Sequence, residues 1–117
     1  MPNVSAGIIG AAETERIGKV PDLSALDLHV EAAYAALADC GISPDEVDGL
    51  ACSMLSPVEV AFELGITPTW IDGTNVGGCS PMLHVRHAIA AIEAGVCSIV
   101  VVVHGQSGRS RVGAPVA

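Results

Sequence analysis

The residues with the clearest capacity for chemistry lie in the stretch 72–81, which reads DGTNVGGCSP. Ser80 and Pro81 suit the N-cap and first position of a helix, so Cys79 is expected at a helix N-terminus. The free N–H groups and the dipole of a helix start stabilise a thiolate and lower the pKa of a thiol. Two interpretations stay open: Cys79 is a nucleophile, or it is a small residue in a tight turn.

Three histidines are further candidates for a functional role. His84 and His87 are three residues apart on the predicted helix, which places them on one face. Two ligands do not hold a zinc ion, so we expect a surface or interface pair and no metal site. His104 ends the apolar run 97–105, and the carboxyl edge of a parallel sheet is where ligands bind. A hydrogen-bonded structural role for His104 is the alternative.

Alternating strands and helices must position these residues. The continuous β-branched run at 98–103 is typical of a strand buried on both faces, as in a parallel sheet. The order β-α-β-α-β-α-β predicts a layered α/β domain with a mostly parallel sheet over residues 1–117. Its tail, 106–117, is expected to be a loop, or the place where a longer chain was cut. The other strands are predicted at 4–10, 47–53 and 69–72, and helices are predicted after Ser24, after Pro57 and after Cys79.

Capping and periodicity define the helices. Ser24 and Asp27 have the spacing of a capping box, and Gly41 suits the residue after a helix end. Each long helix is expected to bury one apolar stripe. The stripes are Leu26, Val30, Ala33 and Leu37 in the first helix, and Met82, Val85, Ile89 and Ile92 in the last.

Composition excludes several classes of function. The chain has 117 residues, half of them hydrophobic, and a net charge of −8, which disfavours nucleic acid and anionic membranes as partners. No apolar run is long enough to span a bilayer, and the opening residues lack the pattern of a signal peptide. Four widely spaced cysteines then indicate free thiols in a cytoplasmic protein. Gly7, Gly10 and Gly18 lack the spacing of a dinucleotide fingerprint.

The stretch NVGGCSPMLHVRHAIAAIEAGVCSIVVVVHGQ resembles the N-terminal half of the thiolase superfamily. Asn75, the alanine-rich segment 88–94, Gly95 and the strand 98–103 match the family pattern. The opening and the first helix are also similar, so the resemblance covers nearly the whole chain. The ending VHGQSGRS is similar to the sterol-carrier-type thiolases and to the thiolase-like aldolases of steroid side-chain breakdown.

The resemblance implies a CoA thioester as substrate, no bound cofactor, and carbon–carbon bond formation or cleavage. The main expectation is an acyltransferase of the acetyl-CoA acetyltransferase kind, with Cys79 as nucleophile. An ungapped count instead places the family nucleophile on Gly78, one residue earlier. The alternative is a retro-aldol lyase of steroid side-chain CoA esters without a cysteine nucleophile, or a non-catalytic docking subunit. The residues expected to bind substrate are Asn75, Gly77, Ser80 and His104.

The resemblance also implies that the chain has protein partners. The family carries further catalytic motifs in a second half, and no such motif occurs in this sequence. We therefore expect a homodimer, or a heteromeric complex with the missing half or with a partner subunit. The strand near residues 70–75 would face the partner in a dimer of the family type.

Overall fold

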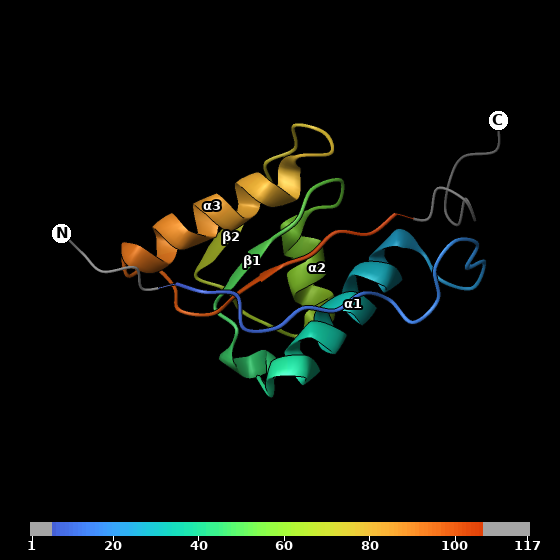
Figure 1. Ribbon diagram of the computed structural model, residues 1–117, viewed down its shortest axis with the longest axis horizontal. Helices are drawn as coiled ribbons and strands as arrows, with labels where there is room; N and C mark the ends of the chain where they lie inside the picture. Colours follow the sequence, from blue (N-terminus) through green and yellow to red (C-terminus); the bar gives the residue numbers. More distant parts are fainter. Residues whose placement is uncertain (1–5, 107–117) are drawn as a thin grey trace.

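The structure is a computed structural model that describes residues 6–106 (Figure 1). Three parallel strands form one sheet with the order β2-β1-β3. The predicted layered α/β fold with a parallel sheet is confirmed, whereas the tail 107–117 lies outside the described residues. In chain order the elements are α1 (Ala25–Cys40), a short 3-10 helix (Pro44–Glu46), β1 (Gly49–Ala51), α2 (Pro57–Leu64), β2 (Trp70–Asp72), α3 (Ser80–Glu93) and β3 (Val100–Val102).

The sheet is sandwiched between helices (Figure 1). Helices α1 and α2 cover one face, and α3 runs across the other. Leu50 on the central strand is fully buried, and it packs in one core cluster with side chains from α1, α2 and β3. The cluster contains Ala33, Leu37, Val47, Leu50, Cys52, Val60, Ala61, Leu64, Ile66, Val101 and Val103.

The ends of α1 follow the sequence prediction. The Ser24 hydroxyl accepts a hydrogen bond from the Asp27 N–H at 3.1 Å, and the Asp27 carboxylate accepts one from the Ser24 N–H at 2.9 Å. This reciprocal pair satisfies two N–H groups that the helix start would otherwise leave open. Gly41 ends the helix with φ of 71°, a left-handed conformation that costs glycine little.

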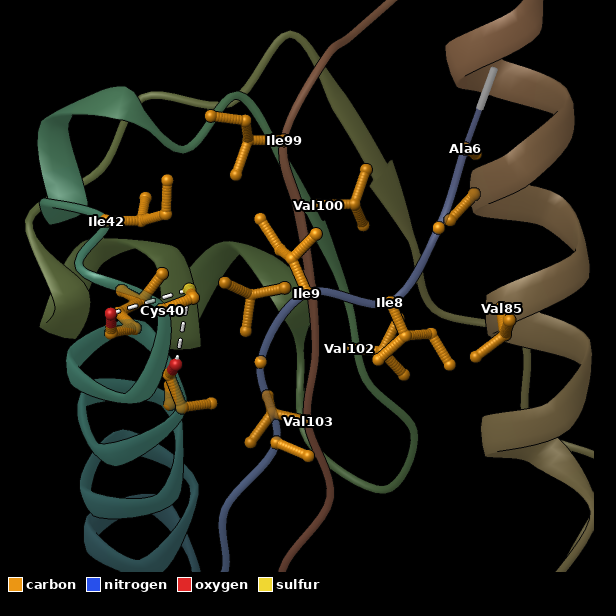
Figure 2. A pocket seen from close by; sticks show the side chains of 18 of the residues that line it. Ala6, Ile8, Ile9, Cys40, Ile42, Val85, Ile99, Val100, Val102 and Val103 are labelled. Atoms are coloured by element: carbon orange, nitrogen blue, oxygen red, sulfur yellow. Dashed lines mark hydrogen bonds between the residues drawn. The ribbon is translucent and has the colours of Figure 1, made fainter. Parts of the chain in front are cut away.

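The predicted strand at 4–10 is wrong over its described part, because residues 6–10 form no strand. The segment lies beside β3, between α1 and α3, where Figure 2 shows Ile8 and Ile9 near the strand. A described backbone bond of this region goes to α1 instead of the sheet: the Ala11 N–H donates to the Asp39 carboxylate at 3.1 Å. A strand needs a neighbouring ladder, and the segment does not pair with one here.

The prediction that α3 buries its apolar stripe is also wrong. Met82 is 76% exposed and Ile89 is 37% exposed, and small or polar residues are buried in their place. Alanines at this face let the helix backbone approach the sheet closely. The start of the helix also differs by one residue, since Cys79 and not Ser80 is the N-cap. The buried residues of α3 are Ser80, His84, Ala88 and Ala91.

The strand β3 is less enclosed than the sequence indicates. Val101 is buried, but Val100 and Val102 are only half-buried. The difference arises because β3 is the edge strand of the described sheet. No helix in the described part of the chain is both long and apolar enough to cross a membrane.

Candidate functional site

Ser80 organises the glycine turn that leads into α3. Its side chain is fully buried, and its hydroxyl accepts a hydrogen bond from the Val76 N–H at 2.9 Å. The same hydroxyl donates to the Gly77 carbonyl at 2.7 Å, which also accepts from the Ser80 N–H at 3.0 Å. Both hydrogen-bonding capacities of the side chain are therefore used inside the turn. Ser80 fixes the shape of the turn instead of presenting its hydroxyl to a ligand.

The two glycines of the turn differ in backbone conformation, although a Cβ at either would meet no atom within 4 Å. Gly77 has φ of 89°, a conformation that a residue with a side chain adopts only at a cost. The Gly77 N–H donates to the Asn75 side-chain oxygen at 3.3 Å, which tightens the turn. A Cβ built on Gly78 meets no atom within 4 Å, so the chain leaves open space at that position. Gly77 is required by backbone conformation, whereas Gly78 is not required by packing.

Cys79 lies exposed at the N-cap of α3. Its sulfur is 3.8 Å from the Val76 carbonyl oxygen. Among the hydrogen bonds of residues 6–106, none uses the backbone N–H of Gly78 or Cys79. Two consecutive N–H groups at a helix start can donate to an anionic oxygen, because the helix dipole favours negative charge there. The turn therefore combines an accessible thiol with two backbone N–H groups that have no partner among the described residues.

The other thiols contrast with Cys79. Burial raises the pKa of Cys52 to about 11, and burial together with the nearby Asp48 carboxylate raises the pKa of Cys97. Both of these side chains are buried. Cys40 is half-buried on α1, where its thiol lies 3.4 Å from the Ala36 carbonyl. Cys79 is thus the exposed thiol among the four.

A polar network connects β2 to α3 directly before the turn. One Asp72 oxygen accepts from the Thr74 N–H at 2.9 Å and from the Thr74 hydroxyl at 2.6 Å, and the other lies 2.7 Å from His87 Nδ1. Hydrogen bonds from Thr74 and His87 lower the pKa of Asp72 despite its partial burial. His84 is fully buried and donates from Nε2 to the Thr74 carbonyl at 2.8 Å.

This network corrects the expectation that His84 and His87 form a surface or interface pair. His84 is buried and structural, and only His87 is partly exposed, with 43% of its side chain accessible. Among the described residues, no three His, Cys, Asp or Glu side chains come together as a metal site would require. The role of Asp72 and Thr74 in holding both histidines was missed, because it depends on the turn bringing β2 against α3.

His104 occupies the predicted position beyond the carboxyl end of β3. It is exposed, and its Nδ1 lies 3.4 Å from the Ser53 hydroxyl, which follows β1. The ring of the fully buried His29 stands edge-on to His104 with 6.1 Å between centroids. Burial chiefly lowers the pKa of His29, and the nearby His104 adds to this effect. Sequence reasoning missed His29 and Ser53, because neither belongs to a motif.

The loop after β1 connects these two groups. Ser53 faces His104, and the next residue, Met54, has its sulfur 3.8 Å from the Asn75 side-chain nitrogen. Met54 also has φ of 75°, an uncommon conformation for a residue other than glycine. Loops after all three strands therefore contribute to one edge of the sheet. Of the predicted site residues, Asn75, Gly77, Gly78, Cys79 and Ser80 share the turn, and His104 lies across the β1 loop from them.

The comparison with solved structures identifies this arrangement. The Ltp2-ChsH2(DUF35) aldolase matches with a TM-score of 0.70 and 31% identity over 89% of this chain. The chain belongs to the thiolase-like fold family. A monomeric SCP2-thiolase like protein type 1 from Mycobacterium smegmatis matches with a TM-score of 0.66 and 31% identity over 81% of this chain. These matches cover 30% and 22% of the two structures, respectively. The predicted family is thereby confirmed, although no protein-family model matches the chain.

Curated relatives of this thiolase-like chain point to one branch. The 17-hydroxy-3-oxo-4-pregnene-20-carboxyl-CoA lyase of Mycobacterium tuberculosis is 35% identical over 109 residues, which are 90% of this chain. The steroid side-chain-cleaving aldolase of Thermomonospora curvata is 33% identical over 112 residues, which are 92% of this chain. The chain spans 28% of the length of each relative. Of the two functional hypotheses from the sequence, these relatives support the aldolase alternative better than the acyltransferase.

Proposed function

We propose that the chain forms part of a thiolase-like lyase that cleaves a carbon–carbon bond in steroid side-chain CoA esters. The observation that carries this proposal is the identity of about a third, over nine-tenths of the chain, to two proteins named for that cleavage. The exposed turn at Asn75–Cys79 is the segment of this chain to which we assign the thioester.

The chemistry requires no covalent intermediate with the protein. In a retro-aldol cleavage, a base removes the proton of the β-hydroxyl group, and the bond between the α and β carbons breaks. The β carbon becomes a ketone, and the electron pair leaves as the enolate of the shorter CoA ester. A proton then returns to the α carbon. The step needs an acid/base pair and donors that stabilise the enolate oxygen.

The glycine turn suits this step. The N–H groups of Gly78 and Cys79 have no other partner among the described residues and lie at the N-terminus of a 14-residue helix. The open space at Gly78 leaves room for a thioester where the family pattern, counted without a gap, has its nucleophile. We assign enolate stabilisation to these two N–H groups, and positioning of the turn to Ser80 and Gly77. Asn75 and His104 are assigned to substrate contacts at the same edge.

An acyltransferase is the second candidate. The observation that favours it is the exposure of the Cys79 thiol at the N-cap of α3. In that reaction the thiolate attacks the thioester carbonyl, the CoA thiol leaves, and an acyl group remains on Cys79. The two candidates therefore differ in whether Cys79 ever carries an acyl group.

The chain spans 28% of the length of each relative, and we propose that further polypeptide contributes to the site. We propose a heteromeric complex, in line with the solved aldolase that is named with a DUF35 component. A homodimer through the free edge of β2 is the alternative. Ile71 on that strand and Phe62 on α2 are exposed, and they lie together beside a shallow apolar hollow.

The proposal is tested with the CoA ester for which the Mycobacterium tuberculosis lyase is named. The chain is mixed with polypeptide that supplies the roughly seven-tenths of the Mycobacterium tuberculosis lyase that it does not match, with and without a DUF35 protein, and is incubated with 17-hydroxy-3-oxo-4-pregnene-20-carboxyl-CoA. The released ketone and shorter CoA ester are measured by mass spectrometry. We expect product with the wild-type chain and an equal amount with Cys79→Ser. Absence of product from both mixtures would contradict the proposal, and loss of product with Cys79→Ser would favour the acyltransferase.

A further inference from the structure

Met54, in the loop after β1, has a backbone conformation that a residue with a side chain disfavours. Its φ is 75°, and within residues 6–106 it is the one residue other than glycine with a positive φ. Left-handed backbone is uncommon for a residue with a long side chain, because the Cβ crowds the following carbonyl oxygen. Strained positions of this kind cluster at ligand sites, so the loop at Met54 is a candidate for contact with substrate.

The residues on either side of Met54 are held in the interior. Ser53 is buried, and its hydroxyl lies 3.4 Å from His104 Nδ1. The buried Cys52 thiol lies 3.5 Å from the Leu55 carbonyl oxygen, and the Leu55 side chain packs against the core cluster. Met54 between them is 60% exposed. The loop therefore turns the Met54 side chain outward while its neighbours stay inside.

The Asn75 amide connects the exposed Met54 side chain to the glycine turn. Its Nδ2 lies 3.8 Å from Met54 Sδ, and its Oδ1 accepts a hydrogen bond from the Gly77 N–H at 3.3 Å. Figure 1 shows the loop after β1 and the turn before α3 next to each other. Val76, the following residue of the turn, is also apolar and is 54% exposed. Met54 therefore adds apolar surface beside the turn to which the thioester is assigned.

The CoA ester for which the Mycobacterium tuberculosis lyase is named has its rings close to its thioester. Its carboxyl group is on carbon 20 and its hydroxyl group is on carbon 17, so the β carbon of the retro-aldol step is itself a ring carbon. A turn that binds the thioester therefore has the ring system beside it. The rings are apolar, and an unbranched thioether side chain adapts to an irregular apolar surface.

We propose that Met54 is a specificity-determining residue whose exposed side chain packs on the steroid rings of the CoA ester. The strained backbone is retained because it aims this side chain at the rings, next to the thioester. The inference rests on the proposed function, and it adds which residue of the chain selects a polycyclic ester over a short acyl-CoA. Met54 takes no part in making or breaking bonds, so its substitution changes the affinity for the ester.

Binding of an ester that cannot be cleaved tests the inference apart from the reaction. The chain is assembled with a DUF35 protein and with polypeptide that supplies the part of the Mycobacterium tuberculosis lyase it does not match. The two probes are acetyl-CoA and the CoA ester of the lyase without its 17-hydroxyl group, which has no β-hydroxyl proton to lose. Isothermal titration calorimetry gives both dissociation constants. We expect Met54→Ala to weaken binding of the steroid ester about tenfold and that of acetyl-CoA less than about twofold.

Two further variants and a control make the test specific. Met54→Gly relieves the positive φ, so it should raise the midpoint of urea unfolding of the chain and still weaken the steroid ester about tenfold. Met54→Leu keeps a long apolar side chain and should retain the affinity within about threefold. Val96→Ala is the control, because Val96 is 47% exposed and precedes β3, at the opposite edge of the parallel sheet. It should bind both probes as the wild-type chain does.

Four results would overturn the inference. Unchanged binding of the steroid ester by Met54→Ala would show that the rings lie elsewhere, and a lower unfolding midpoint for Met54→Gly would contradict the argument from strain. Equal losses for both probes would show that Met54 shapes the turn or, if sedimentation shows weaker assembly, that polypeptide covers it. A wild-type complex that binds the steroid ester no more tightly than acetyl-CoA would also refute it. Failure of the proposed function looks different: Met54→Ala weakens the steroid ester, but the hydroxylated ester is not cleaved.

Discussion

The four thiols should react with an alkylating reagent at widely different rates in the folded chain. Iodoacetamide at pH 8 reacts with the thiolate form of cysteine. Cys79 is exposed, whereas Cys52 has no accessible surface. We therefore expect Cys79 to be modified first and Cys52 last.

The magnitude follows from the pKa of Cys52. Burial raises this pKa from the ordinary 9.0 to about 11, which lowers the thiolate fraction at pH 8 about hundredfold. The reagent must also reach a side chain with no exposure, which requires local opening of the fold and slows the reaction further. Modification of Cys52 should therefore be at least about hundredfold slower than that of an exposed thiol with an ordinary pKa.

Peptide mass spectrometry over a time course gives the four rates separately. In a denaturing concentration of urea the protection should disappear, and the four rates should converge. If Cys52 reacted within about tenfold of Cys79 in the folded chain, the packing of the β1 loop and the exposure of the candidate site would both be wrong.

Three further outcomes are expected. Ser80→Ala should lower the free energy of unfolding by about 1–3 kcal/mol, since it removes two hydrogen bonds of a buried side chain, and urea unfolding followed by the fluorescence of Trp70 measures the loss. Gly77→Ala should cost about 1–2 kcal/mol in the same assay because of its positive φ, whereas Gly78→Ala should cost almost nothing; equal effects would refute the geometry of the turn. The lowered pKa of His29 means that the unfolded chain binds a proton more readily, so stability should be full above the ordinary pKa of 6.5 and fall as the pH drops below it; His29→Gln should flatten that part of the pH dependence of unfolding.

Local sequence signals predicted the caps of α1 and the order of the elements from α1 onward. The capping box of Ser24 with Asp27 and the glycine at residue 41 act within a few residues, so spacing alone reveals them. The glycine turn before Cys79 was predicted for the same reason. The hydrogen bonds that shape it come from Ser80 and Asn75, which are also close in sequence.

Features that depend on distant parts of the chain were not predictable. The apolar period of α3 indicated Val85 and Ile89 as core, but a residue becomes core only when something packs on it, and these two line a groove. His84 was assigned to the surface because its burial depends on the carbonyl of Thr74, ten residues away. His29 and His104 are in contact although they lie 75 positions apart in the sequence (104 − 29), and no sequence motif predicts this contact.

The central claim is tested most directly by measuring whether Cys79 carries an acyl group during turnover. The chain, with a DUF35 protein and polypeptide that supplies the part of the Mycobacterium tuberculosis lyase it does not match, is mixed with 17-hydroxy-3-oxo-4-pregnene-20-carboxyl-CoA, quenched during turnover, and examined by intact and peptide mass spectrometry. A retro-aldol lyase predicts ketone and a shorter CoA ester with no added mass on Cys79. An acyl group on Cys79 that forms and decays at the rate of product formation would contradict the account.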